Sequence, residues 1–538
     1  MSVPTAELTA PRLGAGRKTW PNLVALRLSG NRLYLALGAA ALTIAALSLL
    51  VPSTPSYDPW SWLLWGREIV HLKLQTTGGP TWKPLPVVFT TVFALFGRAA
   101  PDLWLVVARA GSLMAVAMVF KMTVRITSGL TRGDEGERSR LALIPTVLAA
   151  ALAAGSLISS RGFISDNALG YSEGLMTAVV LISIDSHLDG RRRQAFIVGF
   201  FAALDRPELW LAWGPYGLYL WLTDKGARKL VIGLFALIPV LWFLPEYWGS
   251  GHFFRGVNRA HHPRSNSPAF ASCPFCTELG KHAWRTTLLR VKVVAGIAMA
   301  VAAFGLLRFW RGSGWRARLS ESQRARATLI ALGAAGLGWW VLIALLTQLG
   351  FSGNDRYLVL GAALIGIAGG AGWGWAGASL GRLAGRLKAL RIRPRAAGAL
   401  GSLVVAVVFM ALPPWIGANV VDVQATHRAL VYQAHLRGDM SAAVQKVGGP
   451  SKVLRCGTVM TEGFQVPMLA WLLGAHMGRV EASPNKGDPL PPPPNVIFQT
   501  RAQHHAHLLP FVRAWTGTHY QLTAHVRTFH VYEANCRG

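Results

Sequence analysis

One carboxylate stands out because it lies at the edge of a long apolar segment. Asp58 belongs to the tryptophan-rich stretch "SYDPWSW", which directly follows the first long apolar run of the chain. A charge beside a bilayer is costly, so an ionisable residue at this place is a candidate for function. A carboxylate there can take a proton from an attacking hydroxyl, as a general base does. It can also cap the free N–H groups of a helix that begins here, and the sequence leaves both roles open.

Further ionisable residues lie at or near the ends of later apolar runs. They are Arg109, Asp166, Glu173, Asp205, Arg206, Glu208, Asp355 and Arg356. Arg109 lies within its run, where a structural pair or snorkelling toward the surface is the simplest interpretation. The others would line one face of a membrane. Arginines in such a cavity can bind the phosphate of a lipid in a bidentate manner, while a carboxylate activates an incoming hydroxyl. This combination predicts glycosyl transfer from a lipid-linked sugar.

The elements that position these residues are membrane-spanning helices. Of 538 residues, 52% are hydrophobic and only 14% charged, too few to cover a soluble globule of this size. We predict an all-α polytopic membrane protein with about eleven transmembrane helices and a small α/β C-terminal domain. The expected spans lie near 33–51, 102–122, 141–158, 171–187, 195–205, 208–222, 230–247, 292–309, 327–349, 357–378 and 398–414. Segment 195–222 is either two short spans or a broken hairpin.

The net charge of +30 would favour a nucleic-acid partner in a soluble protein. Here the basic residues gather before the first span and in alternate short loops, which is the positive-inside pattern. The pattern predicts a cytoplasmic N-terminus and odd-numbered spans that run outward. Anionic membrane lipid is therefore the expected partner of the basic loops, and we expect no nucleic-acid partner.

Three parts of the chain follow from this topology. Residues 1–32 form a basic cytoplasmic N-terminus, and residues 33–414 form the transmembrane body with outer loops 52–101 and 248–291. Residues 415–538 form a soluble extracytoplasmic domain.

Patterns within the outer parts suggest their elements. Residues 57–72 and 84–96 are amphipathic pieces too short to span, whose tryptophans Trp60, Trp62 and Trp65 suit the headgroup level of a surface helix. The C-terminal part is expected to hold a helix in 425–440, a strand in 451–461, a short apolar segment in 466–478 and a strand in 520–534.

All four cysteines lie in segments expected outside the membrane, where disulfides persist. Cys273 and Cys276 could form a local disulfide. Together with His261 and His262 they could instead form part of a zinc site. Their spacing fits no standard zinc finger, so the disulfide is favoured. Cys456 and Cys536 would staple the C-terminal domain if they lie close together.

The order of these residues resembles the GT-C superfamily of integral-membrane glycosyltransferases, which take a sugar from a polyprenyl-phosphate donor at the outer face. An acidic residue in a juxtamembrane helix after the first span is typical of that superfamily, and Asp58 has that place. "KPLP", residues 83–86, is similar to the Lys-Pro-Pro-Leu-like motif of the protein mannosyltransferase and aminoarabinose transferase branch. "LDRPELW" and "DRYLVL", with Arg206 and Arg356, are similar to further features of such enzymes.

The resemblance implies a role for each position. Asp58 would be the catalytic carboxylate, either as the general base or as the group that orients the acceptor, while Lys83, Arg206 and Arg356 would bind the donor phosphate. Arg109 would be a structural pair, and Asp166 and Glu173 would be second acidic groups or ligands of a divalent cation, which only some members require. The remaining supporting residues are Asp205, Glu208 and Asp355. No metal ligand is assigned.

The implied partners are a polyprenyl-phosphate-sugar donor and an envelope glycan, lipid or protein acceptor. The chain departs from the family pattern in having a single Asp followed by Pro and in having Leu where many members have a second Pro. The identities of its sugar and its acceptor therefore cannot be inferred from known members. A lipid or glycolipid transporter or flippase, or a non-catalytic envelope scaffold, are the alternatives. A transporter would favour broken helices and charges deep in the membrane, whereas the charges here are expected at one face.

Overall fold

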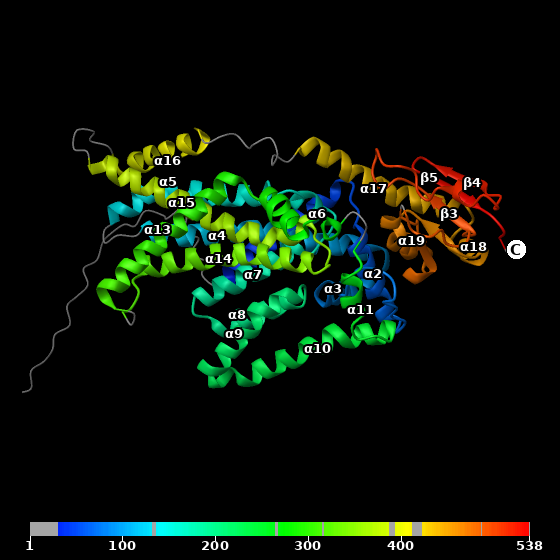
Figure 1. Cartoon of the computed structure of the whole chain (residues 1–538), viewed down its shortest axis with the longest axis horizontal. Helices are drawn as coiled ribbons and strands as arrows, with labels where there is room; N and C mark the ends of the chain where they lie inside the picture. Colours follow the sequence, from blue (N-terminus) through cyan, green and yellow to red (C-terminus); the bar gives the residue numbers. More distant parts are fainter. Residues whose placement is uncertain are drawn as a thin grey trace, which may run out of the picture.

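The structure, a computed structural model, contains a long helical body with a small α/β domain at one end (Figure 1). It describes residues 31–131, 136–263, 267–314, 317–386, 393–411, 422–485 and 487–536. Residues 1–30 of the expected cytoplasmic N-terminus, part of the basic loop 382–395 and the connection 412–421 lie outside the described residues. The predicted fold class, a helical polytopic body with a small α/β C-terminal domain, is confirmed.

Within the described ranges, seven helices are long and apolar enough to cross a membrane. They are α1 (Asn31–Leu47, extended by a 3₁₀ turn at Ser48–Leu50), α4 (Ala100–Thr131), α5 (Gly136–Ile158), α10 (Arg228–Ser250), α13 (Leu289–Ser313), α14 (Glu321–Gln348) and α15 (Val359–Arg386). Each corresponds to one of the expected spans.

The other four expected spans are shorter helices. They are α7 (Glu173–Leu188), α8 (Arg192–Ala203), α9 (Trp210–Thr223) and α16 (Pro394–Ala411). With 16, 12, 14 and 18 residues, each falls short of the roughly 20 residues that an upright span requires. That each of these four crosses the bilayer stays a prediction, and the last three residues of the expected span 398–414 lie outside the described residues.

Helix α15 lies at the centre of the body. It packs against α4, α5, α13, α14 and α16, and every residue from Val359 to Gly374 is buried. Its many glycines and alanines allow this, because small residues let neighbouring helix backbones approach closely in a membrane. At Gly369, an added Cβ would lie only 2.4 Å from the carbonyl oxygen of Val291 on α13.

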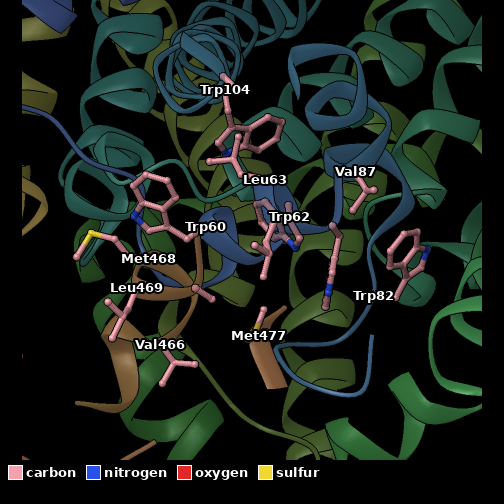
Figure 2. Close-up of a cluster of buried hydrophobic side chains, with 14 of the residues drawn as sticks. Trp60, Trp62, Leu63, Trp82, Val87, Trp104, Val466, Met468, Leu469 and Met477 are labelled. Atoms are coloured by element: carbon pink, nitrogen blue, oxygen red, sulfur yellow. The ribbon is translucent and has the colours of Figure 1, made fainter. Parts of the chain in front are cut away.

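Two short helices, α2 (Tyr57–Val70) and α3 (Pro84–Ala94), pack against each other between the body and the C-terminal domain. The expectation that Trp60, Trp62 and Trp65 lie half-wet at the headgroups is wrong, because all three are at most 2% exposed. Trp62 packs edge-on against Trp104 of α4, and Trp60 packs against Trp471 of the C-terminal domain. Figure 2 shows this apolar cluster, in which side chains of α2 meet those of α19 (Val466–Leu473).

Gly66 sets the closeness of α2 and α3. A Cβ at this position would lie 2.5 Å from the backbone carbonyl carbon of Thr90. We expect Gly66→Ala to lower the free energy of unfolding by about 1–3 kcal/mol, because the two backbones must separate. Thermal unfolding in detergent measures this change. Gly38→Ala on α1, where an added Cβ meets nothing within 4 Å, is the control and should not destabilise the protein. Equal melting temperatures for the two variants would contradict the prediction.

The C-terminal domain is a five-stranded sheet covered by helices. Its elements are α17 (Val423–Lys446), α18 (Pro450–Cys456), β1 (Val459–Thr461), α19, β2 (Val480–Ala482), β3 (Val496–Gln499), β4 (Gln521–Val526) and β5 (Phe529–Glu533). The strand order is β2-β1-β3-β5-β4, with β1 parallel to β2 and β3 and with β5 antiparallel to β3 and β4.

Two strand predictions in this domain need correction. The first half of the expected strand 451–461 is α18, because Pro450 at the first helical position starts a helix that Gly457 ends. The expected single strand 520–534 is a hairpin, whose strands β4 and β5 are joined by Arg527 and Thr528. The helix expected at 425–440 is confirmed as α17.

The structure pairs the cysteines as Cys273–Cys276 and Cys456–Cys536. The second disulfide closes a loop with a sequence separation of 80 residues. We expect replacement of Cys456 and Cys536 by Ser to destabilise the C-terminal domain by about 2–5 kcal/mol, since long loops gain most from closure. Denaturant titration followed by limited proteolysis measures this loss. The double Ser variant at Cys273 and Cys276, whose separation is three residues, should lose less, and equal losses would contradict the prediction.

Candidate functional site

Two of the predicted cationic residues are each followed by a proline that restricts their backbone conformation. Lys83 precedes Pro84 at the start of α3, and Arg206 precedes Pro207 at the start of a short 3₁₀ helix (Pro207–Leu209). Both have extended backbones, with φ, ψ of −136°, 108° and −142°, 126°. A proline disfavours helical geometry in the residue before it and is well suited to the first helical position. The sequences Lys-Pro and Arg-Pro therefore place each cation directly before the first residue of a helix.

Glu173, the first residue of α7, is the centre of the site. Its Oε1 lies 3.3 Å from Lys83 Nζ, 2.7 Å from Arg206 Nη2 and 3.8 Å from Arg356 Nε. The side chain is 3% exposed. A single buried carboxylate therefore gathers three cations that are distant in sequence.

Each of the three cations also has a carboxylate of its own. Arg356 Nη2 donates to Asp58 Oδ2 at 2.7 Å, Arg206 Nη1 to Glu208 Oε1 at 3.2 Å, and Lys83 Nζ lies 3.9 Å from Asp205 Oδ2. Seven of the predicted residues thus come together from elements spread over the chain. Three cations and four carboxylates leave the cluster close to neutral, so the cations are fully compensated in this arrangement.

Asp58 does not cap its helix. The residue preceding α2 is Ser56, the cap makes no side-chain hydrogen bond, and the Asp58 carboxylate instead accepts from Arg356. The side chains of both partners are 13% exposed, so the pair is largely shielded but not sealed from the surroundings. The capping interpretation is therefore not supported.

Two tyrosines complete the cluster, and sequence reasoning did not single them out. The guanidinium of Arg356 lies 3.9 Å from the ring centroid of Tyr171, and that of Arg206 lies 3.7 Å from Tyr357. These cation–π contacts fix the planes of both guanidinium groups. The available signal was proximity in sequence, since Tyr357 adjoins Arg356 and Tyr171 lies two residues before Glu173.

Helix α2 is fastened to the C-terminal domain at the end away from Asp58. Glu68 accepts from His476 at 2.7 Å, and Arg67 donates to the carbonyl oxygens of Trp471 and Ala475 at 2.9 and 3.1 Å. The C-terminal domain therefore orients the helix that carries Asp58.

Arg109 lies apart from the cluster, as a structural residue. Its guanidinium donates to Ser48 Oγ at 2.8 Å, Ser53 Oγ at 2.9 Å and the carbonyl oxygen of Ala168 at 2.8 Å. These bonds join the end of α1 and the following loop to α6 (Phe163–Ala168). Its partners are neutral groups and not the carboxylate that a structural ion pair would have.

Asp355 belongs to a separate ionic group. Its carboxylate pairs with Arg161 at 3.2 Å and with His282 of a π-helical turn (Thr277–Ala283), and the same histidine lies 3.8 Å from Glu278. The pKa of His282 is raised, chiefly by its hydrogen bond to Asp355. Asp355 thus helps to hold the π-helical turn against the helix start that carries Arg356.

Asp166 of α6 lies close enough to the cluster for the charges of Arg356 and Glu173 to affect its pKa. Burial raises its pKa to about 7, with the nearby Glu173 and Asp355 adding to the rise and Arg356 opposing it. The raised pKa means that the folded protein favours the neutral carboxyl. The stability contributed by this group is full below the ordinary Asp pKa of about 4 and is lost as the pH rises through about 7.

We therefore expect Asp166→Asn to stabilise the protein more at pH 8 than at pH 5, because Asn cannot ionise. Thermal unfolding of both proteins at the two pH values measures the difference. Asp102→Asn is the control, since Asp102 is a 45%-exposed carboxylate paired with Arg437 on the surface. A gap between wild type and Asp166→Asn that is independent of pH would contradict the prediction.

The expectation that the membrane body carries its charges at one face needs correction. At the opposite ends of α4 and α7, buried Asp185 pairs with Lys121 and with Arg125, the latter at 2.9 Å. Lys121 and Arg125 lie in the long apolar helix α4 and Asp185 in the shorter α7, and the sequence analysis overlooked all three.

A divalent cation does not fit the acidic residues of the cluster. Among the described residues, no three or more His, Cys, Asp or Glu side chains are arranged to hold a metal ion. Glu173 in particular already lies against three cationic side chains, which would repel a metal. Its alternative role as a metal ligand is therefore not supported.

Comparisons with known proteins give a distant likeness. No protein-family model matches the chain, and no curated protein matches it by sequence. Among solved structures, the chain is similar to ArnT from Cupriavidus metallidurans bound to undecaprenyl phosphate, with 13% identity and a TM-score of 0.46 over 94% of this chain and 98% of that one. The apo state of the same protein gives 13% identity and a TM-score of 0.44 over 93% and 98%. A likeness at this level gives no residue correspondence, so the site is interpreted from its own geometry.

Proposed function

We propose that the protein is a membrane glycosyltransferase that moves a sugar from a polyprenyl-phosphate donor to an acceptor of the cell envelope. The observation that carries this proposal is the Asp58–Arg356 pair at 2.7 Å beside Lys83, Arg206 and Glu173. A potential base and three phosphate-binding side chains thus share one cluster. This combination serves an acceptor hydroxyl and a phosphate leaving group at once.

The donor phosphate would bind by replacing carboxylates on the cations. Each cation is already paired with its own carboxylate, so an arriving phosphate must compete for Arg206, Arg356 and Lys83. Its charge and its bidentate geometry with Arg favour the exchange. Binding of the phosphate to Arg356 would release the Asp58 carboxylate for contact with the acceptor hydroxyl. Donor binding would in this way prepare the base.

In the transfer itself, the acceptor oxygen attacks the anomeric carbon of the sugar. The bond from that carbon to the phosphate oxygen breaks, and the electron pair leaves with the polyprenyl phosphate, whose charge the three cations stabilise. Asp58 takes the proton of the acceptor hydroxyl. A single displacement of this kind inverts the configuration at the anomeric carbon.

We further propose that the face bearing α2, α3 and the C-terminal domain is the extracytoplasmic face. The positive-inside pattern of the sequence supports this orientation, as do the two disulfides on this side. The acceptor would then be a component of the envelope, and the N-terminus would be cytoplasmic.

The proposal is tested with membranes that contain the full chain, a panel of labelled polyprenyl-phosphate sugars and envelope extract as acceptor. We expect one donor to be consumed and its label to appear in the extract. Control membranes lacking the protein should show no transfer. Consumption of no donor in the panel, with the protein expressed and folded, would overturn the proposal.

A transporter or flippase is the second candidate. The Asp185 group, which consists of Asp185, Lys121 and Arg125, provides ionisable residues at the other face of the body. It predicts that a labelled glycolipid changes leaflet in vesicles without loss of its sugar. The same donors, followed for leaflet and for sugar in parallel, separate the two functions.

A further inference from the structure

A positively charged groove lies on the C-terminal domain, away from the Asp58 cluster. It is a cavity of about 610 Å³ between α17 and the segments around β4 and β5, within the size range of ligand sites. Three arginines line it: Arg428 from α17, Arg501 from the loop after β3, and Arg527 from the turn of the hairpin. Four histidines, His427, His435, His504 and His530, also line it.

The positive charge of this groove is only partly compensated. Arg527 pairs with Asp439 at 3.0 Å, and Asp439 also accepts from Thr528 at 2.6 Å. In the ranges that the structure describes, neither Arg428 nor Arg501 takes part in an ion pair, and both are exposed. Arg501 Nη1 donates to the carbonyl oxygen of His504 at 3.5 Å, and the other donors of the two guanidinium groups are available to an anion.

The walls of the groove are held together by polar bonds. Tyr432 donates to the carbonyl oxygen of Arg501 at 3.1 Å, and Gln433 donates to that of Ala502 at 2.6 Å. These bonds fix the loop after β3 against α17. The ring of Tyr432 lies in the wall, edge-on to His504 with ring centroids 5.8 Å apart. A partly exposed aromatic ring beside free arginines suits a ligand that has both sugar faces and anionic groups.

The groove adjoins a second cavity whose lining includes Thr54, four residues before Asp58. His427 and Val431 line both, the second being a mostly apolar cavity of about 420 Å³ bounded by α1, α4 and α6. Thr54 and Leu169 are in its wall. The backbone N–H of Ser56, two residues before Asp58, donates to the carbonyl oxygen of Leu169 at 2.9 Å. The groove and the second cavity therefore share one wall, on α17, and the second cavity reaches the segment that precedes α2.

We propose that the groove binds an anionic segment of an envelope glycan, carrying phosphate or carboxylate groups, and that this glycan is the acceptor of the transfer. The assignment of the glycan as acceptor rests on the proposed function, whereas its binding does not. Arg428 and Arg501 would contact the anionic groups, and Tyr432 would pack against a sugar ring. The electrostatic part of this binding is screened by salt.

The experiment uses the full chain in nanodiscs of neutral lipid, with three labelled probes of similar size: a trigalacturonate, a glycerol-phosphate oligomer and neutral maltotriose. Binding is followed by fluorescence anisotropy at low and high salt. We expect the anionic probes to bind, more weakly at high salt, and maltotriose not to bind. The tighter of the two anionic probes identifies the group that the groove prefers.

A charge-reversal variant tests the location. Arg428→Glu with Arg501→Glu should weaken anionic binding at least about tenfold, because two charge-assisted hydrogen bonds are lost. The matched control is Arg455→Glu with Arg479→Glu, an equal charge change at exposed positions of the same domain outside the groove. Equal weakening in the two variants, unchanged binding in the groove variant, or equal binding of maltotriose would overturn the proposal. Binding of vesicles with anionic lipid in place of the glycans would overturn it as well.

Failure of this inference is distinguishable from failure of the proposed function. Asp58→Asn should bind the anionic probes as the wild type does, because Asp58 does not line the groove. Probe binding without donor consumption would retain the groove as a glycan site and reject the transferase. Donor consumption without probe binding would retain the transferase and reject the groove as a glycan site.

Discussion

Asp58→Asn is expected to lower the rate of sugar transfer by about 10²–10⁴-fold, the usual contribution of a general base. Asn keeps the size of the side chain and can still accept a hydrogen bond from Arg356, which now lies 2.7 Å from the carboxylate. It cannot take the proton of an acceptor hydroxyl. Binding of the donor should survive, because the three cations remain. The measurement is the initial rate of label transfer by purified variants at saturating donor.

Asp102→Asn is the matched control for this prediction. Asp102 lies in the first turn of α4, where it forms an exposed ion pair with Arg437 at 2.9 Å. Its replacement also neutralises one carboxylate but should leave the rate within about twofold, since an exposed pair contributes little. Transfer by Asp58→Asn at the rate of this control would remove Asp58 from the chemistry.

Glu173→Gln is expected to lower the free energy of unfolding by about 3–5 kcal/mol. Removing the charge of a buried member of an ionic network is strongly destabilising, and Glu173 is the carboxylate that lies between the three cations, which would then face one another without it. The amide can replace one hydrogen bond but not the charge. Thermal and denaturant unfolding of the purified protein in detergent measure the loss.

Glu208→Gln is the control for that loss. Glu208 contacts one cation, Arg206, and its side chain is 16% exposed, against 3% for Glu173. Glu208→Gln should lower the free energy of unfolding clearly less than Glu173→Gln does. If the two variants unfold alike, the position of Glu173 at the centre of the cluster does not determine the stability of the site.

The sequence indicated many residues of the site but not how they pair. Lys83 was indicated by the likeness of "KPLP" to a family motif, Arg206 by its place at the end of an apolar run, and Asp58 by its place after the first span. The 2.7 Å pair of Asp58 with Arg356 joins residues separated by 298 positions, and no local pattern reports such a contact. The compensation of every cation by a carboxylate is likewise visible only in three dimensions.

The tryptophans of α2 show a second limit of local patterns. Trp60 and Trp65 have the spacing and flanks of a helix at a membrane surface, and amphipathic periodicity alone supports that interpretation. The segment before α3 and helix α19 cover them, through the contacts of Trp65 with Trp82 and of Trp60 with Trp471. Burial by segments far along the chain therefore overrode the surface prediction.

The helix α18 was missed for a different reason. Its residues are as compatible with a strand as with a helix, and only Pro450 at its start marks the helical choice. The charges of the Asp185 group were overlooked because Lys121 and Arg125 lie within one long apolar helix, α4, whose overall hydropathy conceals single charges.

The central claim is that the cations around Glu173 bind the phosphate of a polyprenyl donor beside Asp58. The most direct measurement is a cryo-electron microscopy structure of the full chain in nanodiscs with added polyprenyl phosphate. The account predicts phosphate density within hydrogen-bond distance of Arg206, Arg356 or Lys83, with the Asp58 carboxylate released from Arg356. Phosphate bound at another place, or an Asp58–Arg356 pair unchanged beside a bound phosphate, would contradict it.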